Sequence, residues 1–149
     1  MIPATTRALG DHSRTYRARD HAVAGRPKIE RLLRELYAAR VRGDLDGVCR
    51  SFADNARFQI AGASQTNPIS VTAVGVDEFR RLLTLMIKTF RLTDQTILSM
   101  IIDGMKAAVD WRATVHSRIT GTTVVTELVD VIEVRDGRIA SYTEFFAPR

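Results

Sequence analysis

Apolar residues repeat at three- and four-residue spacing in three stretches of the chain, a pattern typical of amphipathic helices. The first stretch begins at Lys28 and ends near Gly43, a residue suited to a left-handed helix end. Asp44 is placed to cap a second, short helix, and Asp77 begins a third. The apolar positions of the three helices are Ile29, Leu32, Leu33 and Leu36; Leu45, Val48, Cys49 and Phe52; and Phe79, Leu82, Leu83, Met86, Ile87 and Phe90.

Alternation of apolar and polar residues predicts the strands. Ala56, Phe58 and Ile60 mark a half-buried strand, and a loop is expected over Gly62 to Gly75. Four runs of β-favouring residues follow the third helix, separated by short Gly-containing turns; they cover residues 96–102, 106–118, 122–134 and 138–146. This pattern favours an α+β fold in which a curved, mixed or antiparallel sheet wraps around three N-terminal helices and forms a cone-shaped pocket.

The composition indicates one domain preceded by a short basic N-terminal segment. The chain has 149 residues, is 45% hydrophobic and carries a net charge of +5. Residues 1–27 hold five arginines against two aspartates, so the remainder is nearly neutral. We therefore expect a basic, partly flexible N-terminal extension over residues 1–27 and a single domain over 28–149. This distribution does not favour nucleic-acid binding.

The apolar runs are too short for a membrane span or a secretory signal, which favours a cytoplasmic protein without membrane contact. Cys49 is the single cysteine, so an internal disulfide is excluded and a buried apolar role is expected. The histidines lack neighbouring ligands at metal-binding spacing, so no metal site is predicted.

Two segments carry a family resemblance. The run LLRELYAARVRGDLDGVCRSFADNARFQIAG, residues 32–62, resembles the opening of the ketosteroid isomerase and SnoaL-like families of the nuclear transport factor superfamily. The run VDVIEVRDGRIASYTEFF, residues 129–146, is similar to their closing hairpin. The resemblance covers about residues 28–146 and implies a cone-shaped α+β domain that is usually a homodimer. These motifs encode helix ends and turns, so they specify the fold far better than the activity.

Neither of two known active sites in this superfamily is intact here. The oxyanion-binding tyrosine of the isomerases falls on Leu36, with Tyr37 next to it, and their proton-shuttling aspartate falls on Ile60. Their buried carboxylic acid has a match in Asp130. In the similar limonene epoxide hydrolases, the base falls on Glu144, while the arginine and the acid fall on Asp110 and Arg112 in swapped order. The water-holding tyrosine and asparagine of those hydrolases fall on Phe58 and Ile60.

Two questions of geometry stay open in the sequence. Asp110 and Arg112 share one face of their strand and Trp111 lies on the other, so only one of these faces lines the cone. In the last hairpin, a two-residue Asp136-Gly137 loop would set Val129 opposite Glu144 and turn Asp130 to the other face of the sheet. A three-residue loop with a bulge at Gly137 would place Asp130 and Glu144 on one face, and we favour it.

The leading hypothesis is an enzyme without metal or organic cofactor that isomerises, cyclises or hydrates a small apolar molecule by acid–base catalysis. The candidate catalytic residues are Glu144, Arg112, Asp110 and Asp130, and the candidate substrate-binding residues are Tyr37, Phe58, Trp111, Tyr142 and Phe146. The alternative is a non-catalytic module of the same fold that binds a small ligand or dimerises.

Overall fold

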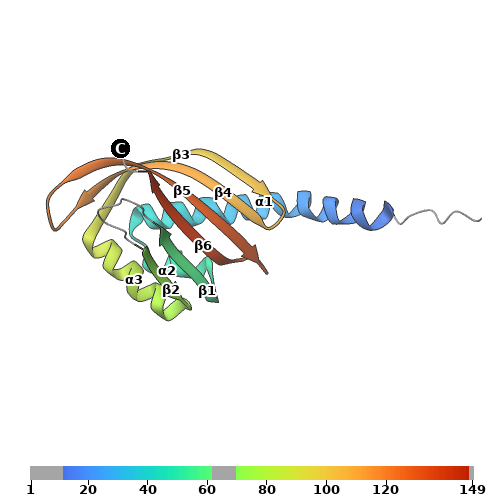
Figure 1. Cartoon of the computed structure of the whole chain (residues 1–149), viewed down its shortest axis with the longest axis horizontal. Helices are drawn as coiled ribbons and strands as arrows, with labels where there is room; N and C mark the ends of the chain where they lie inside the picture. Colours follow the sequence, from blue (N-terminus) through green and yellow to red (C-terminus); the bar gives the residue numbers. More distant parts are fainter. Residues whose placement is uncertain (1–11, 62–69, 148–149) are drawn as a thin grey trace, which may run out of the picture.

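The structure, a computed structural model, describes residues 12–61 and 70–147. Within these residues it has three helices and one six-stranded sheet, and the sheet curves around the helices (Figure 1). The α+β fold expected from the sequence is thus confirmed. No helix in this part of the chain is long and apolar enough to cross a membrane.

Helix α1 spans His12–Arg42 and is longer than predicted. Its C-terminal half buries Ile29, Leu33 and Leu36 and ends at Gly43, which has a φ of 67°. The predicted start at Lys28 is wrong, because Pro27 lies inside the helix. A proline removes one backbone hydrogen bond, but the alanines and arginines before it are good helix formers.

Helix α2 and the first two strands follow. Asp44 caps α2, Leu45–Arg50, by accepting a hydrogen bond from the Gly47 N–H at 2.9 Å, as predicted. Strand β1, Phe52–Ala61, begins at Phe52, which the apolar pattern had assigned to the helix. The predicted loop over Gly62 to Gly75 is shorter than expected, because Ser70–Val74 forms strand β2 and pairs antiparallel with β1. Residues 62–69 of that prediction lie outside the described residues.

Helix α3, Val76–Thr89, leads directly into strand β3, Phe90–Asp103. Phe90 was predicted as helical, yet its backbone is extended and it is the first residue of the strand. The strand therefore begins before the predicted Thr96. The alternation was hidden in the sequence because the pairing register shifts between Thr93 and Thr96, where Asp94 has a φ of 51°.

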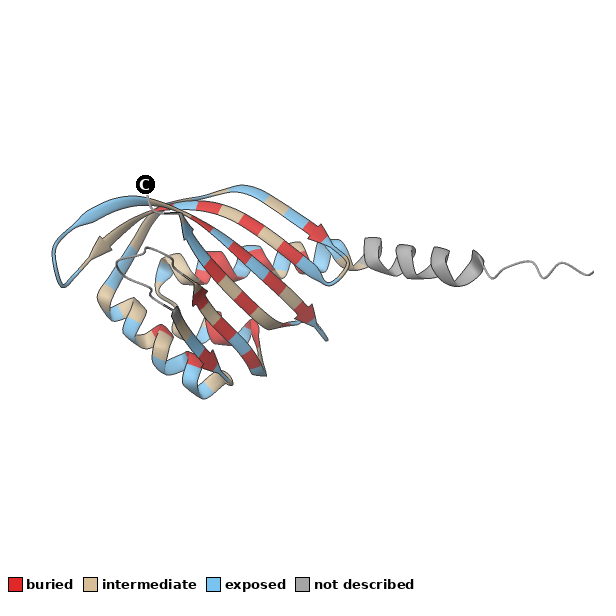
Figure 2. Cartoon of the chain, in the orientation of Figure 1, coloured by how far each residue is buried: buried red, intermediate tan, exposed pale blue. Residues whose placement is uncertain are grey.

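The sheet is completed by β4, Lys106–Ser117, β5, Thr123–Arg135, and β6, Arg138–Ala147. The strand order is β2-β1-β6-β5-β4-β3, in which β1 and β6 are parallel and every other pair is antiparallel. Buried and exposed residues alternate along the strands (Figure 2). One face of the sheet therefore packs on the helices and the other faces outward.

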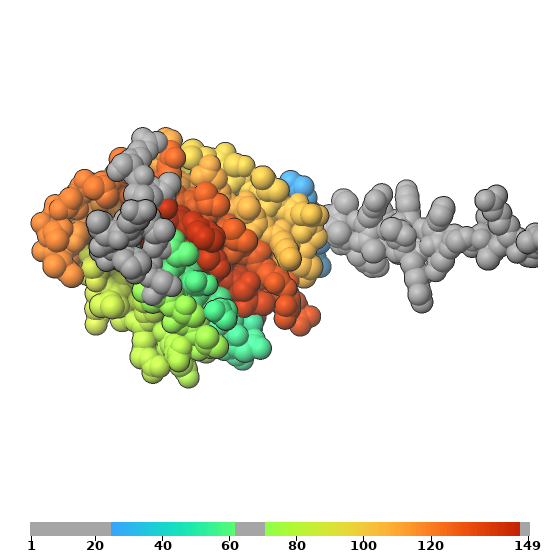
Figure 3. Space-filling model, in the orientation of Figure 1, coloured from blue at the N-terminus to red at the C-terminus, as the bar shows by residue number. Residues whose placement is uncertain are grey.

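The outward face of the sheet carries apolar residues. Val129 and Val131 of β5 and Phe145 of β6 are exposed there, with Ile101 of β3 in the same row as Val131. Strands β1, β6, β5 and β4 form one broad face in the space-filling view (Figure 3). We call Ile101, Val129, Val131 and Phe145 the outer patch.

Candidate active site

A cavity of about 890 Å³ lies between the ends of α1 and α3 and the inner face of the sheet. Most of its wall is apolar and includes Ile60, Val71, Leu82, Leu83, Met86, Ile87, Leu92, Val115, Leu128 and Phe146. Trp111, Glu144 and Arg40 also line it and are largely buried, so they form its floor. Cavities of this size and polarity are typical of small-molecule sites.

Glu144 is the carboxylate of the cavity floor. It comes from β6, is 1% exposed, and is held by Arg40 of α1. Arg40 Nη1 donates to Glu144 Oε2 at 2.7 Å, and Nη2 lies 3.5 Å from Oε1. The Arg40 guanidinium also lies over the Trp111 ring, 5.1 Å from its centroid. Burial acts to lower the pKa of Arg40, but the charges of Glu144, Tyr142 and Asp130 and the hydrogen bond to Glu144 together raise the pKa above its ordinary value.

Asp130 is a second, fully buried carboxyl group behind this floor. Its Oδ2 accepts hydrogen bonds from Tyr37 Oη at 2.5 Å, from Trp111 Nε1 at 2.6 Å, and from Tyr142 Oη. Its Oδ1 is buried without a hydrogen-bond partner among the described residues. Burial and the charge of Glu144 raise the pKa of Asp130 to about 7, although Arg40 and the two tyrosines oppose the shift. A proton on Asp130 would therefore be placed on Oδ1, because Oδ2 already accepts three donors.

Tyr142 connects the two carboxyl groups through hydrogen bonds, directly to Asp130 and through Arg40 to Glu144. Its hydroxyl accepts a hydrogen bond from Arg40 Nη1 at 3.0 Å and donates to Asp130. Burial, and then the charge of Asp130, raise the pKa of both Tyr142 and Tyr37 above their ordinary value. Both phenols therefore stay protonated at neutral pH and serve as hydrogen-bond donors, not as bases.

The last hairpin brings Asp130 and Glu144 to the same face, by a route that differs from the predicted one. The turn is a two-residue Asp136-Gly137 loop with φ values of 50° and 74°, closed by the pair Arg135 and Arg138. The register then shifts at Ala140, because Glu133 pairs with Ser141 and Val134 with Ile139. Asp130 consequently lies directly opposite Glu144. The shared face was predicted correctly, but the expected three-residue turn was wrong.

Asp110 and Arg112 do not reach this site. On β4 the apolar face, Val109, Trp111 and Ala113, is buried against the helices, so the polar face points outward. Arg112 is exposed and bonds Glu127 on the neighbouring strand at 2.6 Å. The candidate catalytic residues Arg112 and Asp110 therefore lie outside the cavity, and the arginine that binds Glu144 is Arg40.

Only part of the predicted lining faces the cavity. Trp111 and Phe146 line it. Tyr37 and Tyr142 lie behind the floor, where they bond Asp130. Phe58 is core, because its ring stacks on Tyr142 with 5.4 Å between centroids.

Arg40 is the residue that the sequence analysis missed. It lies three residues after Tyr37 and four after Leu36, so it continues the buried stripe of α1. A cation on an otherwise apolar helix face is costly to bury without a partner. Its position on that stripe was therefore a usable signal for a buried carboxylate partner.

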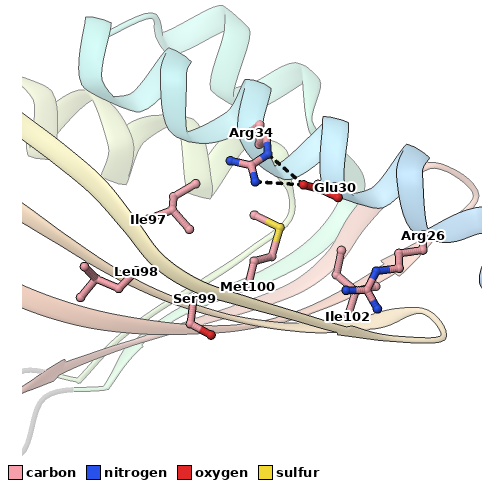
Figure 4. A pocket seen from close by; sticks show the side chains of 8 residues that line it. All are labelled: Arg26, Glu30, Arg34, Ile97, Leu98, Ser99, Met100 and Ile102. Atoms are coloured by element: carbon pink, nitrogen blue, oxygen red, sulfur yellow. Dashed lines mark hydrogen bonds and ion pairs between the residues drawn. The ribbon is translucent and has the colours of Figure 1, made fainter.

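A smaller hollow, of about 220 Å³, lies between α1 and β3 (Figure 4). Its charged side chains are Arg26, Glu30 and Arg34, of which Glu30 and Arg34 are paired at 2.9 Å on the helix surface. It shares no residue with the cavity floor. The described residues contain no group of three or more His, Cys, Asp or Glu side chains placed to hold a metal ion.

Comparison with known proteins gives the same fold. The sequence profile of the SnoaL-like domain matches residues 33–142. A proposed isomerase from Bacillus subtilis superposes with a TM-score of 0.71 at 22% identity, covering 82% of this chain and 88% of that one. A proposed polyketide cyclase from Xanthomonas campestris gives 0.67 at 20% identity, with 83% and 93% covered. An LEH-like epoxide hydrolase of M. tuberculosis gives 0.66 at 20% identity, with 81% and 84% covered. No curated protein matches the chain.

Proposed function

Because the chain belongs to the SnoaL-like family, we propose that it is a cofactor-independent enzyme that isomerises, cyclises or hydrates a small, largely apolar molecule by general acid–base catalysis. The observation that carries this proposal is the Arg40–Glu144 pair on the floor of an apolar cavity. Apolar walls exclude water from the charged pair, and this favours proton transfer between the pair and a bound organic molecule.

Glu144 is the proposed base. Its Oε2 is engaged by Arg40 at 2.7 Å, whereas the 3.5 Å contact to Oε1 is too long for a strong hydrogen bond. Oε1 is therefore the oxygen free to accept a proton from a substrate carbon next to a carbonyl group, or from water. Arg40 then stabilises the negative charge that develops on the substrate oxygen, and Glu144 returns the proton to a different atom.

Asp130 is proposed as a positioning residue, because it does not line the cavity. It fixes the Tyr142 hydroxyl, and that hydroxyl accepts from the same Nη1 that binds Glu144. The chain Asp130, Tyr142, Arg40, Glu144 thus holds the guanidinium in one orientation. Preorganised donors of this kind contribute to catalysis because they need no reorientation during the reaction.

One observation favours a second candidate, a non-catalytic binding module. Arg40 and Glu144 already neutralise each other, and three donors converge on Asp130, so the network would also serve folding alone. Buried ion pairs are found in structural as well as catalytic settings.

A ligand screen followed by a turnover assay separates the two. Small apolar carbonyl compounds and epoxides are screened for thermal stabilisation of the protein, and each hit is incubated with it and analysed by NMR. We expect Glu144→Gln to bind the hits but to lower turnover at least about 100-fold, as for loss of a general base. The control is Glu127→Gln, which alters a carboxylate paired on the outer side of the sheet.

Two results would count against the enzyme. Undiminished turnover in Glu144→Gln would remove the proposed base. Hits that bind the wild type and are never converted would favour the binding module.

The assembly proposed with this function is a homodimer in which the outer patch of one chain packs on that of a second. Four large apolar side chains exposed together on one sheet face support it. The cavity lies on the inner side of the sheet and the outer patch on the other side, so each chain would keep its own site.

A further inference from the structure

The open end of the cavity is rich in arginine. Besides Arg40 and Glu144, the ionisable residues of its wall are Arg42, Arg91, Arg118 and Asp94. All four are exposed, whereas Arg40 and Glu144 are largely buried. The four therefore lie where the cavity meets solvent, and we call them the mouth cluster. It contains three cations and one anion.

The fold brings these arginines to the wall of one cavity. Arg42 is the last residue of α1. Arg91 is the second residue of β3 and pairs with His116 of β4. Arg118 follows β4, and its backbone N–H donates to the Thr89 carbonyl at the end of α3 at 2.8 Å. The β4–β5 turn and the α3–β3 junction consequently meet at one end of the molecule (Figure 1).

Two of these cations lack an acidic partner in the described part of the chain. Other surface arginines are paired closely, as Arg80 is with Asp46 at 2.8 Å and Arg112 with Glu127 at 2.6 Å. Arg42 has only a 3.5 Å contact with Asp44. For Arg91 and Arg118, the side chains that the structure describes provide no ion pair, so both guanidinium groups are available to an incoming anion.

We infer that the substrate is amphiphilic, with an apolar body that fills the cavity and an anionic carboxylate or phosphate group that binds Arg91 and Arg118 at the mouth. This inference rests on the proposed function and adds the chemical class of the substrate. Guanidinium groups bind carboxylate and phosphate oxygens through paired, charge-assisted hydrogen bonds.

The opposite orientation is disfavoured by the charges of the floor. Arg40 is neutralised by Glu144, and Asp130 lies directly behind them. An anion at the floor would meet two carboxyl groups and no free cation, whereas at the mouth it meets three arginines against Asp94. The anionic end therefore stays near solvent, and the apolar body brings a carbon atom to Glu144.

Trp111 allows a direct test, because it is the single tryptophan of the chain and lines the cavity. Its fluorescence is followed during titration with decanoate, decyl phosphate and neutral 1-decanol, each below its micelle concentration. We expect at least one of the anions to bind about tenfold more tightly than decanol at low salt, a value in line with two exposed charge contacts. The preference should weaken at high salt. The tighter of the two anions identifies the head group.

The double variant Arg91→Gln with Arg118→Gln should bring this ratio to about one while leaving the decanol affinity within about twofold. The matched control is Arg57→Gln with Arg81→Gln, which removes two exposed charges away from the cavity and should keep the preference. Equal or tighter binding of decanol to the wild type would overturn the inference. So would an unchanged preference in the Arg91 and Arg118 variant, or saturable binding of none of the three probes.

Failure of this inference can be told apart from failure of the proposed function. Glu144→Gln should keep the preference for anions, because it leaves the mouth cluster intact. If the protein converts only neutral compounds, and this turnover depends on Glu144, the inference about the anionic group is overturned but the proposed enzymatic function is supported. A preference for anions without turnover of any compound would support the anionic head group and count against the proposed enzyme.

Discussion

At the scale of single residues, Asp130 shows two opposed influences on one carboxyl group. Three donors converge on Oδ2 and favour the ionised form, while burial and the nearby charge of Glu144 favour the neutral form. Burial and the Glu144 charge prevail, so the pKa rises to about 7. The donors still matter, because they fix which oxygen is left to carry the proton.

This shift has a consequence for stability. The pKa of Asp130 in the folded protein, about 7, is higher than that of an unfolded aspartate, about 3.9. The folded state therefore holds the proton more tightly, and its stabilising effect is complete below pH 4 and is lost as the pH rises to about 7. We expect this contribution to the free energy of unfolding to decline by at most about 1.4 kcal/mol per pH unit across that window.

The measurement is urea unfolding between pH 4 and pH 8. Asp130→Asn keeps an oxygen that accepts the three donors but cannot titrate, so the difference between wild type and variant should vary with pH over this window. Asp110→Asn, the same substitution on the outer face of β4 and away from the Asp130 hydrogen bonds, is the matched control variant. A wild-type minus Asp130→Asn difference that is constant with pH would contradict the prediction.

At the scale of elements, the hairpin turns depend on glycine conformation. Gly137 has a φ of 74° in the two-residue turn between β5 and β6, and a methyl group added there would meet nothing within 4 Å. Gly25 also has open space around it but lies inside helix α1. The same substitution therefore has opposite effects at the two positions.

We expect Gly137→Ala to lower the free energy of unfolding by about 1 kcal/mol, because alanine is strained in the left-handed conformation. Gly25→Ala should raise it by up to about 1 kcal/mol, because alanine favours the helix. Each variant is compared with the wild type by urea unfolding at one pH. A loss of stability in Gly25→Ala, or none in Gly137→Ala, would contradict the prediction, because both positions have open space and differ in backbone conformation.

The elements also show which features a sequence pattern can reveal. Helix stripes and Gly-containing turns depend on nearby residues, so α2, α3 and the order of the last four strands were predictable. The bulge at Ala140 leaves no such pattern, because alanine is compatible with either face. The choice of face on β4 likewise depends on packing against the helices, and the sequence alone left it open.

Arg40 illustrates the same limit for the site. Its partner Glu144 is 104 residues away in the sequence, on the last strand, and only the folded sheet brings them together. Glu144 and Asp130 were identified because carboxylates among apolar strand residues are unusual. The cation was overlooked because the helix pattern was traced through apolar residues only.

At the scale of the whole molecule, the two faces of the sheet carry different features. The inner face holds the cavity and the Arg40–Glu144 pair, and the outer face carries the outer patch. On the outer patch, Ile101 and Val131 flank Ala108 in one row of the sheet, and Val129 pairs with Phe145 in the next, so the apolar surface is continuous. A symmetric pair of chains would bury this surface against itself.

We therefore expect a dimer in sedimentation equilibrium, converted largely to monomer by Val131→Asp, because a carboxylate would be buried opposite an apolar surface. Val74→Asp is the matched control: Val74 is equally apolar and exposed, but it lies on the edge strand β2. A wild-type monomer at high protein concentration, or an intact dimer in Val131→Asp, would contradict the proposed interface. Since all cavity residues come from one chain, the Val131→Asp monomer should still show the Trp111 fluorescence response to decanoate.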